Sequence, residues 1–126
     1  MLKAVLIDAS AISRDLLKGV LTEGGHQVVG QTHTCSQGVA LMQKYQPQIV
    51  CIAREQIDDP YDIVAQIRAQ LPKTLVFMVS GELDAPTVQV AVARGVHGFI
   101  VRPFKADTVL KSIRNTVLAM IRRQQA

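Results

Sequence analysis

Short apolar runs alternate with longer amphipathic stretches along the chain, and this alternation constrains the fold more than any other feature. The runs lie at Lys3–Ile7, 48–52 and 75–79, and each has the length of one strand. Strands that alternate with helices predict βαβ units and a parallel sheet. We expect one domain over residues 1–126, because a chain of this length can bury a core without disulfides.

Breaker residues and helical periodicity indicate the remaining elements. A first helix over 11–23 should end at Gly24-Gly25, because glycine tolerates the left-handed geometry of a helix cap. Ser36 is expected to cap a second helix that runs to about Tyr45. We further expect a second strand around 28–30, helices over about 61–70, 85–94 and 106–123, and a fifth strand over 99–101. Apolar spacing in the first helix predicts one buried face, made of Ile12, Leu16, Leu17, Val20 and Leu21.

Composition limits the classes of protein that remain. Hydrophobic residues make up 48% but aromatics only 4%, so we expect an aliphatic core. Cys35 and Cys51 show no motif spacing, which favours a reducing compartment, and Cys51 should be a buried small hydrophobe. No apolar run reaches the roughly 18 residues of a membrane span, and the first strand leaves no room for a signal peptide. We therefore expect a cytoplasmic protein.

Charge and side-chain chemistry argue against nucleic-acid binding and against catalysis. The net charge of +4 comes from 14 basic and 10 acidic residues, without a docking motif or stacking aromatics. His26, His33 and His97 lack the spacing of metal ligands, so we expect satisfied or surface histidines. No catalytic triad or glycine-rich phosphate loop is present. The chain is not expected to be an enzyme.

The segment 95–104 reads Gly-Val-His-Gly-Phe-Ile-Val-Arg-Pro-Phe, with two glycines and a proline at fixed spacing. It is similar to a Gly-Ala-x-Gly-aromatic-apolar-x-Lys-Pro-Phe signature, and the order of motifs over about residues 2–120 resembles the response-regulator receiver domain of two-component signalling. The resemblance implies an α/β, flavodoxin-like (βα)5 fold, with a five-stranded parallel sheet in the order 2-1-3-4-5 and helices on both faces.

The resemblance also implies that the acidic site of this family is degenerate here. Two adjacent acids end the first strand in the family, and this chain has Asp8 and Ala9. The phosphoacceptor aspartate corresponds to Ala53, and alanine has no carboxylate for acyl-phosphate formation. Mg²⁺ requires oxygen ligands, so we expect weak or absent Mg²⁺ binding and no cofactor. No residue is assigned a catalytic, cofactor-binding or metal-binding role.

Other positions of the vestigial pocket keep part of the family pattern. The resemblance places Ser80 at the hydroxyl position, Arg102 at the lysine position and Phe99 at the aromatic that switches with activation. The bond between Arg102 and Pro103 is expected to be cis, as the family's Lys-Pro bond usually is.

Two charged contacts remain open at this stage. Glu55 either points over the pocket and replaces part of the lost charge, or is a solvated loop residue. Arg102 or Arg54 is expected to pair with Asp8, with the alternative that neither does.

The first functional hypothesis is an atypical receiver that works by phosphorylation-independent protein–protein interaction. Its interface would be the face formed by the helix over 85–94, the strand over 99–101 and the helix over 106–123, binding a protein partner or a second copy. Val88, Val92 and Val96 should give this face apolar exposure. The alternative is a small-ligand or anion sensor that uses the vacated pocket. We expect any output domain to lie outside these residues, and nucleic-acid or membrane binding by this domain is not expected.

Overall fold

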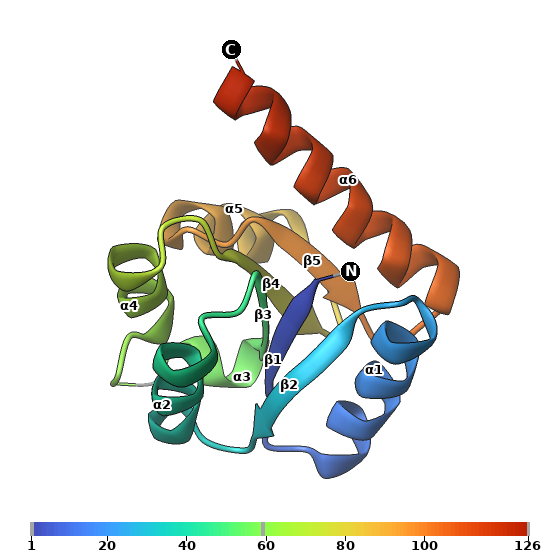
Figure 1. Ribbon diagram of the computed structural model, residues 1–126, viewed down its shortest axis with the longest axis horizontal. Coiled ribbons are helices and arrows are strands. Elements are labelled where there is room, and N and C mark those ends of the chain that lie inside the picture. The colour runs from blue at the N-terminus through green and yellow to red at the C-terminus, as the bar shows by residue number, and fades with distance from the viewer. Residues whose placement is uncertain (1, 59, 126) are drawn as a thin grey trace.

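Parallel strands form the centre of the protein in a computed structural model that describes residues 2–58 and 60–125. The sheet has the order β2-β1-β3-β4-β5 and is flanked by helices on both faces (Figure 1). This confirms the predicted flavodoxin-like architecture. The strands are β1 (Lys3–Ile7), β2 (Gln27–Thr32), β3 (Ile49–Ala53), β4 (Leu75–Ser80) and β5 (Gly98–Val101).

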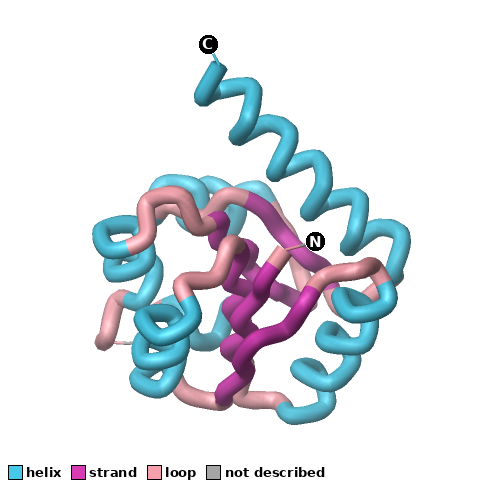
Figure 2. The backbone as a smooth tube through the Cα atoms, viewed as in Figure 1, coloured by secondary structure: helices cyan, strands magenta, loops and turns pink. Residues whose placement is uncertain are grey.

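Helices alternate with the strands, except that α3 and α4 both lie between β3 and β4 (Figure 2). One-turn helix α3 was not expected, so the helices expected over 85–94 and 106–123 carry the labels α5 and α6. The helices are α1 (Ala11–Glu23), α2 (Cys35–Tyr45), α3 (Arg54–Ile57), α4 (Ile63–Gln70), α5 (Ala85–Arg94) and α6 (Ala106–Gln125).

Alternate strand residues fill two separate cores, one on each face of the sheet. Val50 and Ile52 of β3 point to the face that packs against α2, α4 and α5. Ile49 and Cys51 point to the opposite face, which packs against α1 and α6. Each fully buried aliphatic side chain contributes about 1.5–3 kcal/mol. Cys51 is buried as predicted, and burial raises the pKa of its thiol to about 12.

The predicted buried face of α1 is partly wrong. Ile12 is 74% exposed and Leu16 is 59% exposed, whereas Ser13, Leu17 and Leu21 are buried. The helix is rotated so that the row of residues four apart, starting at Ser13, faces the sheet. Ser13 is polar, and the apolar face predicted from sequence periodicity did not include it. Its burial has a partner, described below with the site.

Several element boundaries also differ from the prediction. Thr34, and not Ser36, caps α2, because its side-chain oxygen accepts a hydrogen bond from the backbone N–H of Gln37. The helix expected over about 61–70 begins only at Ile63, because Asp62 has left-handed backbone with φ 45°. Asp59 of the preceding loop lies outside the described residues. Strands β2, β4 and β5 and helix α6 are longer than expected by one to three residues, β3 is shifted by one residue, and β1 has the expected bounds.

The apolar exposure expected on α5 is only partly present. Val92 is 55% exposed, but Val88 is half-buried and Val96 is buried in the core. Val96 follows Gly95, which ends α5 with a φ of 112°, and the turn directs Val96 inward. The predicted helix end at Gly95 is confirmed.

The last helix extends away from the sheet. Its first half packs against the sheet and α1 through Val109 and Ile113, whereas Figure 1 shows its carboxyl-terminal half extending beyond the sheet. Among the described helices, none has both the length and the apolar character needed to cross a membrane.

Candidate functional site

The parallel register brings four of the predicted site residues to one edge of the sheet. Ile7 pairs with Ile52, and Ser80 pairs with Val101. Residues at or just beyond these positions therefore meet at the carboxyl ends of β1, β3, β4 and β5, where open α/β sheets place their binding sites. The four residues are Asp8, Ala53, Ser80 and Arg102.

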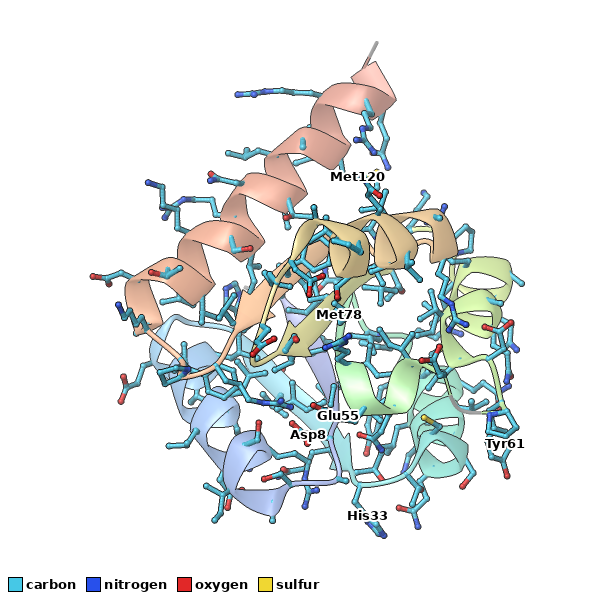
Figure 3. All side chains as sticks on the ribbon, turned by 180° about the vertical axis from the view of Figure 1, so that it is seen from behind. Asp8, His33, Glu55, Tyr61, Met78 and Met120 are labelled. Carbon is cyan, nitrogen blue, oxygen red and sulfur yellow. The ribbon has the colours of Figure 1, made fainter. Side chains whose placement is uncertain are left out.

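Arg102 is the centre of this edge, because its guanidinium contacts three side chains. Nη2 donates to Asp8 Oδ2 at 2.9 Å, and Nη1 donates to Glu55 Oε1 at 3.2 Å. Nε donates to the Ser13 hydroxyl at 3.2 Å. Figure 3 shows Asp8 and Glu55 side by side at this edge, and both contact Arg102. The expected Arg102–Asp8 pair is confirmed, and Glu55 points over the pocket.

The backbone around Arg102 directs its side chain across the edge. The backbone N–H of Arg102 donates to the carbonyl oxygen of Ser80 at 2.9 Å, which continues the β4–β5 pairing by one residue. The bond from Arg102 to Pro103 is cis, as predicted. Strand pairing therefore holds the arginine on the same side as Asp8.

Asp8 is the buried member of the acid pair, with 8% of the residue exposed. Oδ1 accepts the backbone N–H of Ser10 at 2.8 Å, while Oδ2 accepts from Arg102. Partial burial opposes the charge on Arg102, but the hydrogen bonds and negative charges of Glu55 and Asp8 outweigh it, so the pKa of Arg102 is raised. The arginine remains fully charged and offsets the buried carboxylate.

The other predicted positions have different partners. Ala53 is almost completely buried and begins α3 without a side-chain cap. The Ser80 hydroxyl donates to the carbonyl oxygen of Glu82 at 2.6 Å and accepts its backbone N–H at 3.2 Å, so it closes its own loop. Phe99 is half-buried against the core that contains α2, α4 and α5. Pro103 is exposed.

Two details of this edge differ from sequence reasoning or were missed by it. Arg54 does not pair with Asp8: it lines a hollow of about 230 Å³ beside Asp58 and Arg94, which themselves form an ion pair at 2.9 Å. Ser13 was missed as a partner of Arg102. Its only signal was a polar residue in the first turn of a helix that begins just after β1.

The described residues contain no group of three or more His, Cys, Asp or Glu side chains placed to hold a metal ion. Two histidines instead bond to backbone. His26 Nδ1 accepts the N–H of Leu2 at 3.2 Å, and His97 Nδ1 accepts the N–H of Val76 at 3.0 Å. His33 is exposed.

Comparison with known proteins identifies the family. The sequence model of the response regulator receiver domain family matches residues 4–114. The chain therefore belongs to the response-regulator receiver family, whose members are signalling domains of two-component systems that contact kinases and output domains and are not enzymes in the usual sense.

Chemotaxis proteins are among its relatives. The chemotaxis protein CheY of Listeria monocytogenes is 29% identical over 114 residues, which cover 90% of this chain and 96% of that protein. CheY of Bacillus subtilis is 29% identical over 119 residues, covering 91% and 97%. Among solved structures, CheY4 of Vibrio cholerae has a TM-score of 0.82 at 23% identity, covering 92% of this chain and 98% of that one. The receiver domain of NtrX from Brucella abortus has a TM-score of 0.77 at 26% identity, covering 90% and 96%.

Proposed function

We propose that this chain is an atypical receiver domain that signals without being phosphorylated, through protein–protein contact. One observation carries the proposal. At the edge where the family resemblance places phosphorylation chemistry, Ala53 offers no carboxylate, and Arg102 joins Asp8 and Glu55 in a closed ion-pair network. Acyl-phosphate formation requires a carboxylate nucleophile, so Ala53 cannot carry out this reaction.

Mg²⁺ does not fit the residues at this edge. Two carboxylates lie there, on Asp8 and Glu55, and each already has an oxygen bound by the Arg102 guanidinium. Mg²⁺ requires near-octahedral oxygen coordination at short distance, and a cation already lies between the two acids. Ala9 adds no ligand. We therefore propose that the domain binds Mg²⁺ weakly or not at all and needs no cofactor.

The same network weighs against an anion sensor in the vacated pocket. An anion there would have to compete for Arg102 with two carboxylates, one of them on the buried Asp8. Losing the arginine would leave that carboxylate without its counter-charge, which is costly for a buried group. The interaction module is therefore the better of the two hypotheses.

The proposed interface is the α5–β5–α6 face. A groove of about 390 Å³ lies on it, lined by Phe99, Val101 and Lys105 among others. Val101 is 42% exposed and Val92 is 55% exposed, so the face offers apolar area with a basic residue at its edge. Apolar area surrounded by polar residues is typical of protein-binding surfaces. We propose a protein partner or a second copy here, in the cytoplasm, with any output domain outside this chain.

Acetyl phosphate tests the loss of phosphorylation. After incubation with acetyl phosphate and Mg²⁺, intact-mass spectrometry is expected to show only the unmodified protein, because Ala53 has no carboxylate. Ala53→Asp, which restores a carboxylate at this position, is the comparison variant in the same reaction. A hydroxylamine-labile phosphoryl adduct on the unmodified sequence would refute the proposal.

The interface is tested by self-association. Val101→Glu places a charge in the α5–β5–α6 groove, and Ile12→Glu is a matched control on α1, where the original side chain is 74% exposed. If the occupant is a second copy, sedimentation equilibrium should show a dimer that Val101→Glu abolishes and Ile12→Glu preserves. A monomer at all concentrations favours a different protein as partner, and a dimer lost only with Ile12→Glu contradicts the proposed face.

A further inference from the structure

Another cavity lies at the edge of the sheet opposite to the Arg102 site, near the amino ends of β4 and β5. It is a cavity of about 480 Å³ between the end of α4, the α5–β5 loop and the outward half of α6. Figure 3 shows Met120 on α6 above α5, where it lines this cavity. The residues that matter below are Arg68, Val92, His97, Met120 and Arg123.

The lining of this cavity is cationic and contains no acid among the described residues. Arg68 comes from α4, His97 from the loop before β5, and Arg123 from α6. The ion pairs found between described residues involve Arg94 and Arg102, and none involves Arg68 or Arg123. Three nitrogen-bearing side chains from separate elements therefore converge without a carboxylate to balance them.

The ring of His97 is held by the end of the neighbouring strand. The backbone N–H of His97 donates to the carbonyl oxygen of Val76 at 2.8 Å, and the N–H of Val76 donates to Nδ1 at 3.0 Å. A nitrogen that accepts a hydrogen bond carries no proton, so the neutral ring has its proton on Nε2. Nε2 is consequently a donor that faces the cavity.

The donor on His97 has another donor beside it. Nη1 of Arg68 lies 2.9 Å from Nε2 of His97, and a guanidinium has no acceptor to offer. Two N–H groups thus converge, and neither can accept a hydrogen bond from the other, so an oxygen placed between them could accept from both. Burial is the largest cause that lowers the pKa of His97, and the positive charges of Arg68 and Arg123 lower it further.

Gly95 helps to hold Arg68 in this position. A Cβ atom at Gly95 would lie 3.2 Å from Cγ and Cδ of Arg68, so the absence of a side chain lets the arginine stem lie across the loop. The φ of 112° at Gly95 is also unfavourable for other residues. The loop therefore combines the helix end, the fixed histidine and the supported arginine.

We propose that this cavity binds a small phosphorylated ligand, with the phosphate held by Arg68, His97 and Arg123. Guanidinium groups bind phosphate oxygens in a bidentate manner, and a phosphate oxygen supplies the acceptor that the two facing donors lack. The volume falls within the range of small-molecule sites and exceeds what a phosphate alone would fill. Val92 and Met120 provide apolar surface for the rest of the ligand, as a mononucleotide would require.

This inference does not rest on the loss of phosphorylation, although Val92 lines the cavity and also belongs to the proposed α5–β5–α6 face. The cavity residues are separate from Asp8, Glu55 and Arg102. The domain can therefore lack phosphorylation without binding a phosphorylated ligand in this cavity. It can equally bind such a ligand whether or not it is phosphorylated at the carboxyl edge. Different variants and different readouts test the two ideas.

Calorimetric titration with three probes tests the site: 5′-AMP, inorganic phosphate and adenosine. We expect AMP to bind more tightly than phosphate, and adenosine not to bind measurably. Arg68→Gln and Arg123→Gln should each weaken AMP by about tenfold, since each removes a charge-assisted hydrogen bond. Arg122→Gln is the matched control, because it makes the same change one residue away on an arginine that does not line the cavity. It should weaken AMP less than twofold, an approximate limit for a distant, screened charge.

Histidine NMR provides a readout that a general basic surface would not produce. AMP should shift the Nε2 resonance of His97 and leave that of His33 unchanged, because only His97 lines the cavity. Equal losses with Arg122→Gln and Arg123→Gln, equal binding of adenosine and AMP, or no binding of AMP at millimolar concentration would each overturn the proposal. Circular dichroism of every variant excludes unfolding as the cause.

Discussion

The two edges of the sheet place positive charge in opposite situations. At the carboxyl edge, Arg102 contacts Asp8, Glu55 and Ser13, and its charge is balanced by two acids. At the amino edge, Arg68 has a histidine donor as its neighbour, and no described acid lines the cavity. An arginine whose donors are occupied contributes to structure. An arginine that faces another donor is available to a ligand.

Replacing the two arginines with methionine should separate these situations most clearly. Arg102→Met is expected to lower the free energy of unfolding by about 1–3 kcal/mol, because it leaves the buried Asp8 carboxylate without its partner. Arg68→Met should change it by less than about 0.5 kcal/mol, as at most surface sites. Urea denaturation of both variants provides the measurement. Equal losses would mean that the contrast between the edges has no energetic basis.

A double-mutant cycle sharpens the contrast within the carboxyl edge. Asp8→Asn and Arg102→Met should be coupled by about 0.5–3 kcal/mol, as expected for neighbours in one network. Glu55→Gln should couple to Arg102→Met by less than about 1 kcal/mol, because the Glu55 side chain is 64% exposed and solvent screens the pair. Chemical denaturation of the single and double variants measures both couplings. Additivity at Asp8 would contradict the role of Arg102 as its counter-charge.

The response of the melting temperature to Mg²⁺ tests the carboxyl edge. Millimolar Mg²⁺ should shift the melting temperature of the unmodified protein by less than about 1 °C, since a ligand must bind the folded state to stabilise it. Removing the competing cation with Arg102→Met should make the response to Mg²⁺ larger. Scanning calorimetry with and without Mg²⁺ measures this difference. A shift of several degrees in the unmodified protein, lost in Asp8→Asn, would show that the edge still holds the metal.

The smallest expected effect is a pH dependence at the amino edge. The pKa of His97 lies below its ordinary value of 6.5, because burial and the charges of Arg68 and Arg123 disfavour the protonated ring. The unfolded chain then binds a proton at a pH where the folded protein does not, so stability falls as the pH drops below about 6.5. His97→Asn, which retains an acceptor for Val76, should show a smaller decline. Urea midpoints between pH 5 and 7.5, roughly the range in which histidine titrates, measure the difference, and identical profiles would contradict it.

Much of the carboxyl edge was predictable because the topology determines it. Residues that end consecutive parallel strands meet at one edge whatever the details of packing. The sequence therefore predicted that Asp8, Ala53, Ser80 and Arg102 would be neighbours, and it favoured the Asp8–Arg102 pair correctly. The strand order was implied by the family resemblance, and the structure confirms it.

The amino-edge cavity was not predictable in the same way. Arg68, His97 and Arg123 come from three elements separated by more than twenty residues, and His97 occupies a variable position of the 95–104 signature. His97 was expected to be a surface histidine or one with its hydrogen bonds made. This is correct for Nδ1, which accepts from Val76, but not for Nε2, which lies beside Arg68. The direction of a ring and the end of a long helix depend on tertiary contacts, which have no local signal.

The sequence by itself determined the alternation of strands and helices and the residues at the strand ends, because hydrophobic periodicity and strand ends are local properties. The order of the sheet came from the resemblance carried by the 95–104 signature and the order of motifs. Only the tertiary structure decided which side of α1 is buried, since Ile12 and Ser13 are neighbours and packing determines which one faces the sheet. It also decided that Glu55 joins Arg102 while Arg68 faces a donor. Both outcomes depend on which distant groups are brought within hydrogen-bonding distance, and only the folded chain determines that.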